Sequence, residues 1–335
     1  MTERVAVVLL NLGGPDSLDA VEPFLFNLFS DPDIIDFPGS FLFRKKLAKM
    51  ISTRRAPMVQ KQYAKIGGKS PIKEFNLQQA ALLEAKLNER VVAKVFVAMR
   101  YWHPSTDEAI DAILAENIEK IILLPLYPQF SKATTVSSTK EWQKRVKERG
   151  LSSKFDVMSV DEYHTDQGYI QALVERVNEG LERFDPEVSS QVEIVFSAHG
   201  TPMKLVRSGD SYSDHIKETV AAVMERGNYS QPHTLCYQSK VGPLKWLEPS
   251  TPDTVNRLAA EGVKQMLIVP IAFTSDHLET LFELNIEYRR VAKEAGVEQY
   301  EMTEGLNYSP TFIDALARIV FEKLGIENDA RGAAA

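Results

Sequence analysis

The chain has 335 residues, more than one hydrophobic core usually serves, so two domains are expected. Its 44% of hydrophobic and 25% of charged residues are ordinary for a globular protein, while a formal net charge of −7 argues against nucleic acid as a general partner. The single cysteine, Cys236, excludes a disulfide framework and any zinc or iron–sulfur site held by cysteines of one chain.

Apolar segments alternate with helical patterns along the chain. Such runs, bounded by turn residues, predict buried strands, and they lie at residues 5–12, 91–99, 121–127, 192–197, 235–238 and 266–273. Because long helical stretches separate them, the pattern predicts an α/β fold with parallel sheets flanked by helices. No run is long enough for a transmembrane helix and no signal peptide is visible, so a cytoplasmic protein is expected.

Residues 24–72 break this pattern. Six phenylalanines fall between Phe24 and Phe43, and a group of Arg and Lys residues follows them. One interpretation is a helix hairpin in the core with a basic outer face. The other is an aromatic lip for a large apolar ligand or a lipid surface, with cations for its carboxylates or headgroups.

The chain also contains an internal repeat. Segments that start at Pro104 and Pro249 both read loop, helix cap, helix and strand, and Pro125 and Pro270 interrupt the two strands at the same place. The repeat predicts two similar α/β domains that face each other across a cleft. The expected parts are an N-terminal domain at 1–165, a C-terminal domain at 166–310, a helix at 311–324 that crosses back to the first domain, and a tail at 325–335.

The stretch at 266–288 reads as a strand, a tight turn and a helix. Asp276, His277 and Glu279 gather at the carboxyl end of the strand, where open α/β sheets bind ligands. A row of glutamates recurs every four residues along the helix, at Glu279, Glu283 and Glu287. One interpretation is a capping box of Asp276 with Glu279, followed by a solvated acidic face. The other is an acidic row that leads cations or protons to a His/Glu site.

His199 follows another buried strand, in the sequence FSAHG, where Gly200 frees the backbone to turn. A histidine at such an edge is often structural. A second histidine and a glutamate at the matching strand end favour a site, because imidazole and carboxylate bind divalent ions and imidazole accepts protons near pH 7. Gly13 and Gly14 do not complete a dinucleotide fingerprint, so nucleotide binding is not favoured.

Several co-linear motifs resemble those of ferrochelatases, which insert ferrous iron into protoporphyrin IX to give protoheme. They are LNLGGP, RYWHP, FSAHGTPM, QSKVGPLKWLEP and VPIAFTSDHLETL, and with RRAP…QYAKIGGKSPI they span nearly the whole chain. The resemblance implies the chelatase fold, with two Rossmann-like domains and a porphyrin cleft between them. This agrees with the repeat.

The resemblance also assigns roles to residues of this chain. His199 and Glu279 would form the catalytic, metal-side pair, with His199 as a pyrrole proton acceptor or a metal ligand. The implied metal or proton path comprises Asp276, His277, Glu283 and Glu287. The implied porphyrin contacts are Leu12, Arg55, Tyr63, Ser70, Arg100, Tyr101 and Trp246. Leu12 stands where some members carry Met, so it offers no sulfur donor.

The implied substrates are protoporphyrin IX and Fe²⁺, with no permanently bound cofactor. Many ferrochelatases hold a [2Fe–2S] cluster on four cysteines, but with Cys236 alone no cluster is expected. The aromatic lip would touch the inner face of the cell membrane peripherally. Alternatives are a coproporphyrin or cobalt chelatase of the same fold, or a non-catalytic two-lobed protein that binds a metal or tetrapyrrole.

Overall fold

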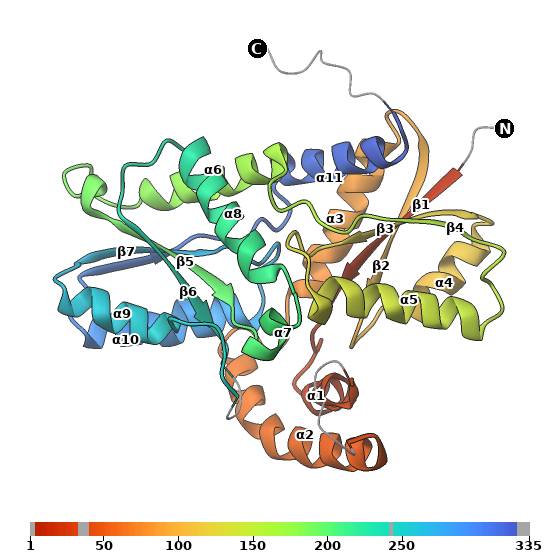
Figure 1. Cartoon of the computed structure of the whole chain (residues 1–335), viewed down its shortest axis with the longest axis horizontal. Helices are drawn as coiled ribbons and strands as arrows, with labels where there is room; N and C mark the ends of the chain where they lie inside the picture. The colour runs from red at the N-terminus through yellow and green to blue at the C-terminus, as the bar shows by residue number, and fades with distance from the viewer. Residues whose placement is uncertain (1–3, 33–39, 241–243, 327–335) are drawn as a thin grey trace.

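The computed structural model describes residues 4–32, 40–240 and 244–326, with side chains from residue 43 in the second range. Two four-stranded parallel sheets lie in the two halves of the chain, in the orders β2-β1-β3-β4 and β6-β5-β7-β8 (Figure 1). The strands are β1 (Arg4–Asn11), β2 (Val92–Met99), β3 (Lys120–Pro125), β4 (Asp156–Ser159), β5 (Glu193–His199), β6 (His233–Gln238), β7 (Gln265–Pro270) and β8 (Gln299–Met302).

The predicted parallel α/β architecture is confirmed, with two differences at the strands. The short edge strands β4 and β8 were not predicted, because DVMS and QYEM contain no apolar run. The runs at 121–127 and 266–273 end as strands at Pro125 and Pro270, and their last residues form the turns that follow.

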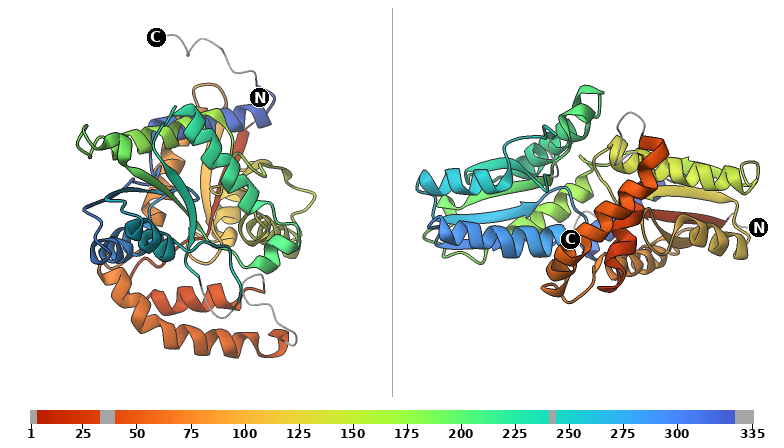
Figure 2. Two further views of the ribbon diagram at one scale, coloured as in Figure 1. Left: turned by 60° about the vertical axis from the view of Figure 1, so that its left-hand side comes forward. Right: turned by 90° about the horizontal axis from the view of Figure 1, so that it is seen from below.

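Helices cover both sheets (Figures 1 and 2). Those of the first half are α1 (Val21–Ser30), α2 (Ser40–Ala64), α3 (Ile72–Leu87), α4 (Thr106–Ala115), the π-helix η1 (Lys132–Val136) and α5 (Ser137–Glu148). The second half has α6 (Gln167–Leu181), the short 3₁₀ helix η2 (Ser189–Gln191), α7 (Met203–Arg207), α8 (Tyr212–Arg226), α9 (Thr251–Ala260), the π-helix η3 (Glu279–Tyr288), α10 (Arg289–Glu294) and α11 (Pro310–Lys323).

The register of the sheets bears out the internal repeat. In the first sheet Leu10 pairs with Pro125 of the neighbouring strand, and in the second Ser197 pairs with Pro270. The repeated prolines therefore occupy the same place in two sheets of the same order. Central strands in both sheets are almost fully buried, as expected when helices cover both faces.

The last helix, α11, joins the two halves. It packs against α3 of the first half and α6 of the second. Asp314 lies 3.1 Å from the ammonium of Lys86, and the Arg90 guanidinium lies 4.6 Å from the centre of the Phe321 ring. These contacts support the proposed return of this helix to the first domain, while the boundaries at 165 and 310 remain a proposal.

The helices α1 and α2, which contain most of the described residues of the 24–72 region, form a helical pair that lies along one side of the molecule (Figures 1 and 2). Buried side chains of α1 and α2, among them Phe24 and Phe29, make a small core of their own. Phe43 and Met50 are each 62% exposed on α2. The pair therefore has a packed core and also presents large apolar side chains to solvent. A role for these exposed side chains at an apolar ligand or a lipid surface stays a prediction. Phe37 and the Phe41 side chain lie outside the described residues.

Within the described residues, no helix has the length and apolar character needed to cross a bilayer.

Candidate functional site

The turns after two paired strands bring His199 and Glu279 together. Because β5 and β7 are neighbours in one parallel sheet, their carboxyl ends meet at the same edge. Nδ1 of His199 lies 3.4 Å from Oε2 of Glu279, and both side chains are partly buried. The Tyr212 hydroxyl donates to the main-chain oxygen of His199 at 3.0 Å and holds that turn in place.

A second imidazole approaches Glu279 from the other side. Nε2 of His277 lies 3.0 Å from the same Oε2 atom, and its Nδ1 lies 3.1 Å from the Ser275 carbonyl oxygen. The ring of Phe273 packs 4.6 Å from that of His277 and 6.5 Å from that of His199. The carboxylate therefore lies between two imidazoles against an aromatic wall.

The capping-box interpretation of this turn is wrong. The helix η3 is a π-helix with no side-chain cap at its start. The buried Asp276 carboxylate instead accepts hydrogen bonds from Thr280 Oγ1 and Asn307 Nδ2, each at 2.8 Å, and from the Gly305 amide at 3.1 Å. Asp276 is thus drawn to the loop before α11, which leaves the Glu279 side chain free to face the imidazoles.

His199 and Glu279 each shift the pKa of the other toward the charged form. Burial alone would lower the pKa of His199, but the Glu279 carboxylate outweighs burial and raises that pKa above its ordinary 6.5. Burial alone would raise the pKa of Glu279, but His199 and His277 hold it well below its usual range. The pair therefore holds a carboxylate beside an imidazole that gains basicity from it.

Glu283 follows Glu279 along the π-helix and has a different character. It accepts hydrogen bonds from the amide and hydroxyl of Ser239, at 2.9 and 2.6 Å, and from the Tyr288 hydroxyl at 2.5 Å. Burial, and then the nearby charge of Glu279, raise the pKa of Glu283. It therefore holds a proton more readily than an exposed glutamate. Glu287, further along η3, is partly exposed.

Four of the residues assigned to porphyrin binding lie near His199 and Glu279 or belong to or pack against the helices α1 and α2. The Trp246 ring meets His199 edge to face, with ring centres 6.4 Å apart. Tyr63 is buried, hydrogen-bonded to Ser70, and close enough to Glu279 for that charge to add to the effect of burial in raising the pKa of Tyr63. Leu12 packs against the small core of α1 and α2.

The other three serve different partners. The Tyr101 hydroxyl donates to the Asp31 carboxylate at 2.7 Å, and the residue is only 3% exposed. Arg100 donates to the same carboxylate at 2.5 Å and lies 3.6 Å from Glu141. Arg55, partly exposed on α2, lies 5.6 Å from the centre of the Phe29 ring. A porphyrin contact for these residues remains a prediction.

Sequence reasoning missed five residues that hold the site, namely Phe273, Tyr212, Gln238, Ser239 and Tyr288. Gln238 donates to the main-chain oxygen of Glu279 at 3.0 Å. Phe273, Gln238 and Ser239 lie at or just beyond strand ends of the second sheet, which is the signal that could have found them. Tyr212 and Tyr288 carry no such signal, because their hydroxyls reach the site from helices.

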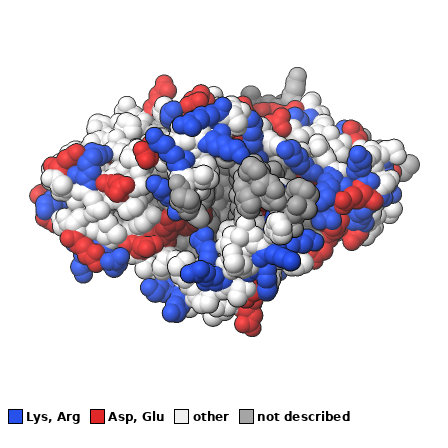
Figure 3. Space-filling view, turned by 60° about the horizontal axis from the view of Figure 1, so that its bottom comes forward, with Lys and Arg blue, Asp and Glu red and all other residues white. Residues whose placement is uncertain are grey.

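Figure 3 shows the side of the molecule that carries α1 and α2. Lys and Arg side chains lie above and below a hollow near the centre of this view, and Asp and Glu side chains lie to its lower left. Positive charge at such a mouth suits a ligand that carries carboxylates.

The chain resembles known proteins along almost all of its length. Residues 4–324 match the family model described as Ferrochelatase. A ferrochelatase of Geotalea daltonii is 48% identical over 321 residues, covering 96% of this chain and 98% of the relative. One of Trichodesmium erythraeum is 45% identical over 324 residues, covering 96% of this chain and 83% of the relative.

Solved structures support the fold. SirB from Bacillus subtilis with Fe³⁺ superposes with a TM-score of 0.56 at 12% identity, covering 96% of this chain and 95% of that protein. CbiX, the terminal enzyme of siroheme biosynthesis in denitrifying bacteria, gives a TM-score of 0.50 at 12% identity, covering 94% and 98%. The two sheets and their helices thus have the chelatase arrangement.

Proposed function

The chain belongs to the ferrochelatase family and is a metal chelatase of heme biosynthesis with Fe²⁺ as substrate, and we propose how its residues divide the reaction. One Fe²⁺ replaces the two protons on the pyrrole nitrogens, so the site must hold a cation and accept protons. The observation that carries the proposal is the contact of His199 with Glu279, 3.4 Å apart at the joined ends of two strands.

His199 accepts the two pyrrole protons one after the other and passes them to the acidic row, and Glu279 sets its basicity. Desolvation by itself would make the imidazole a weaker base, but the neighbouring carboxylate raises the pKa of His199 and so strengthens proton abstraction. Glu279 stays anionic because the adjacent imidazoles outweigh its burial. A carboxylate oxygen is then present for the incoming ferrous ion as it sheds water.

The acidic row carries protons or metal between the pair and solvent. Glu283 is the first step, because its raised pKa lets it take up and release a proton next to Glu279. Glu287 continues the row, and His277 holds Glu279 from behind. Asp276 fits a positioning role on this path, since its oxygens accept three hydrogen bonds that fix the turn.

The macrocycle is protoporphyrin IX, held at the mouth between the two halves. Its apolar face meets Trp246 and Leu12, and Arg55 on α2 pairs with a propionate. Tyr63 and Ser70 support this wall from behind, since both are buried. The alternatives are coproporphyrin as the macrocycle or Co²⁺ as the metal, with the same pair of residues at work.

The helical pair meets a lipid surface without crossing it. Phe43 and Met50 are exposed on α2, which also carries the exposed cations Lys45, Lys46 and Arg54. Apolar side chains that dip into the interface, together with cations that face anionic headgroups, give peripheral attachment. This would place the protein in the cytoplasm, at the inner face of the cell membrane.

No [2Fe–2S] cluster is expected as part of this reaction. The sequence has one cysteine, and burial raises the pKa of the Cys236 thiol to about 11. A protonated, buried thiol is a poor metal ligand.

The decisive experiment is to mix the protein anaerobically with protoporphyrin IX and Fe²⁺ and to measure heme formation from the absorbance of the Soret band. A chelatase forms heme in large excess over protein, whereas a binding protein stops at one equivalent. Parallel reactions with coproporphyrin, or with Co²⁺ in place of Fe²⁺, rank the alternatives by kcat/KM. If no combination of macrocycle and metal gave more than one equivalent of metallated product per protein, the proposal would be overturned.

A further inference from the structure

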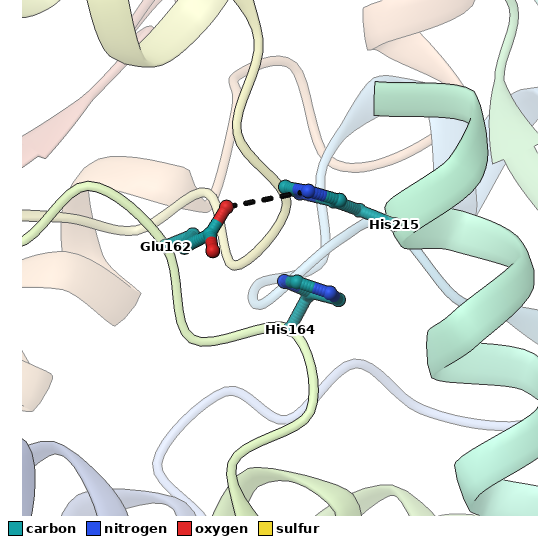
Figure 4. Close-up of side chains that lie close together, drawn as sticks. All are labelled: Glu162, His164 and His215. Carbon is teal, nitrogen blue, oxygen red and sulfur yellow. Dashed lines mark ion pairs between the residues drawn. The ribbon is translucent and has the colours of Figure 1, made fainter. Parts of the chain in front are cut away.

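A second group of potential metal ligands lies between the two halves, apart from the His199 turn. Glu162 and His164 belong to the segment that joins β4 to α6, and His215 lies on α8. Each offers one ligand atom within 4.8 Å of the other two. Figure 4 shows the three side chains converging, with the two imidazole rings stacked. Their ring centres are 3.8 Å apart and their planes differ by 5°.

His164 presents a buried nitrogen that has no partner. The residue is 7% exposed, and its Nδ1 atom has no hydrogen bond to any described residue. Its Nε2 atom lies 2.7 Å from a carboxylate oxygen of Glu218, one turn beyond His215 on α8. A carboxylate on one nitrogen of a histidine orients the ring and leaves the other nitrogen for a metal. A buried nitrogen without a partner is costly, and a bound cation would satisfy it.

His215 supplies a second nitrogen, with one rearrangement. Its Nε2 atom lies 3.3 Å from Glu162, and its Nδ1 atom accepts a hydrogen bond from the Phe130 amide at 3.2 Å. Burial, and then the nearby His164, lower the pKa of His215, which favours the neutral ring that a metal ligand needs. A metal on Nε2 would move the ring proton to Nδ1, and the long contact with Phe130 would break.

The site has an approach from solvent. Glu162 is exposed and lines a cavity of about 670 Å³, whose wall also includes Asp161, Glu322 and Lys323. Three carboxylates against one ammonium leave this wall acidic, which favours cations.

We infer that Glu162, His164 and His215 bind a divalent transition-metal ion, at a site separate from the one that feeds the porphyrin. Two imidazoles and one carboxylate are a ligand set for Fe²⁺, Co²⁺ or Zn²⁺ rather than for Mg²⁺ or Ca²⁺. Glu218 acts behind the site by orienting His164. The ion would tie the segment between the halves to α8.

Anaerobic equilibrium dialysis with Co²⁺ tests this on the full chain, with visible absorption as a report on coordination. The wild-type protein should show a bound cobalt that survives in His199→Ala and disappears, or weakens at least tenfold, in His164→Ala and in His215→Ala. His103→Ala is the matched control, since His103 is an exposed imidazole in the first half that pairs with Glu108 instead. It should bind cobalt as the wild type does.

Two further measurements distinguish the loss of a metal ligand from misfolding of a variant. Glu162→Gln changes one atom of an exposed side chain and should also weaken cobalt binding at least tenfold. In wild-type protein, Zn²⁺ should shift the amide resonance of Phe130, because its acceptor is lost. Equal cobalt binding by the wild type and by the His164, His215 and Glu162 variants, with no change at Phe130, would reduce the group to an ordinary pair of ion-paired histidines.

Discussion

The two halves of the molecule share one backbone plan and differ in chemistry. Leu12 follows β1 at the position where His199 ends β5, because Leu10 and Ser197 hold the same place in their sheets. Likewise Thr134 stands in η1 where Glu279 stands in η3, counted from the repeated prolines. One half therefore carries the titratable pair, at the end of β5 and the start of η3, and the other carries an aliphatic and a hydroxyl side chain at the matching positions.

The first-half turn has a supporting task instead. The Asp210 carboxylate accepts from the Lys132 amide at 2.7 Å and from the Ser131 hydroxyl at 3.1 Å, and it also accepts from the Tyr212 amide at 3.0 Å. Through Tyr212 this clamp reaches the backbone of His199. The comparison teaches that the fold supplies two equivalent edges, while side chains decide which edge reacts and which one braces it.

The largest expected effect comes from removing the imidazole that the first half lacks. His199→Ala should fold normally and lose iron insertion by orders of magnitude, because no other described imidazole occupies this turn. Initial rates of heme formation measure this, and circular dichroism checks the fold. His103→Ala, the exposed counterpart control, should keep its rate. More than a tenth of the wild-type rate in His199→Ala would remove this residue from the mechanism.

Glu279→Gln makes the second half resemble the first, in which an uncharged residue holds this position. The shape is kept, so the melting temperature should change little, while turnover should fall severely because the anion beside His199 is gone. Thr134→Val, the matched change in the first half, should leave turnover nearly intact. Normal turnover in Glu279→Gln would return the residue to a structural role.

The same variant has a signature in pH. In the wild type the pKa of His199 lies above its ordinary 6.5, so its contribution to stability is full below pH 6.5 and is lost as the pH rises through the folded pKa. Without the Glu279 charge, burial lowers the pKa of His199 and only the charge of Glu283 still raises it, so this pKa should fall. NMR titration of the imidazole resonances measures this. An unmoved midpoint would mean that the carboxylate does not set the basicity of His199.

The bracing between halves predicts a smaller effect. Gln79 of α3 is fully buried, donates to Ser275 Oγ at 3.1 Å and accepts from Asn76 at 2.9 Å. Gln79→Leu removes these hydrogen bonds, and another to the main-chain oxygen of Asn307, next to the reactive turn. This should cost about 1–3 kcal/mol of unfolding free energy and lower kcat more than it raises KM. Gln78→Leu, on the exposed side of the same helix, is the control. Equal stability of both variants would make the network dispensable.

Much of this architecture could be predicted from the sequence because it depends on local patterns. Apolar runs identified six of the strands, and the repeated prolines identified the duplication. The short edge strands β4 and β8 escaped because DVMS and QYEM carry no apolar run, and the π-helix escaped because its residues suit an ordinary helix equally well. The partner of Asp276 also could not be foreseen, since Asn307 comes from a distant loop.

The same limit applies to the second group of ligands. Glu162 and His164 stand in an irregular segment with no motif, and His215 lies within an ordinary amphipathic helix. Only the packing of α8 against that segment brings them together. Motifs located His199 and Glu279 because they lie at or beyond the end of a strand. A site whose ligands come from a loop and a distant helix leaves no such pattern in the sequence.

The smallest expected effect concerns the helical pair, which has no counterpart among the described residues of the second half. The test changes Phe43 and Met50, which are both 62% exposed on α2. Changing both to Ser should weaken flotation with anionic liposomes and raise the Kd for protoporphyrin IX severalfold, while the dependence on metal at saturating porphyrin stays unchanged. The electrostatic contribution to liposome binding should also fall as salt is added, since each Lys or Arg near the membrane surface contributes up to about 1 kcal/mol.

Leu77→Ser, at a 47% exposed apolar position on α3, is the control for a general loss of surface hydrophobicity. Because the pair is packed on its own small core, these exposed changes should leave the fold intact. Two unaltered affinities would make α1 and α2 a packed hairpin with no role at a membrane or a porphyrin.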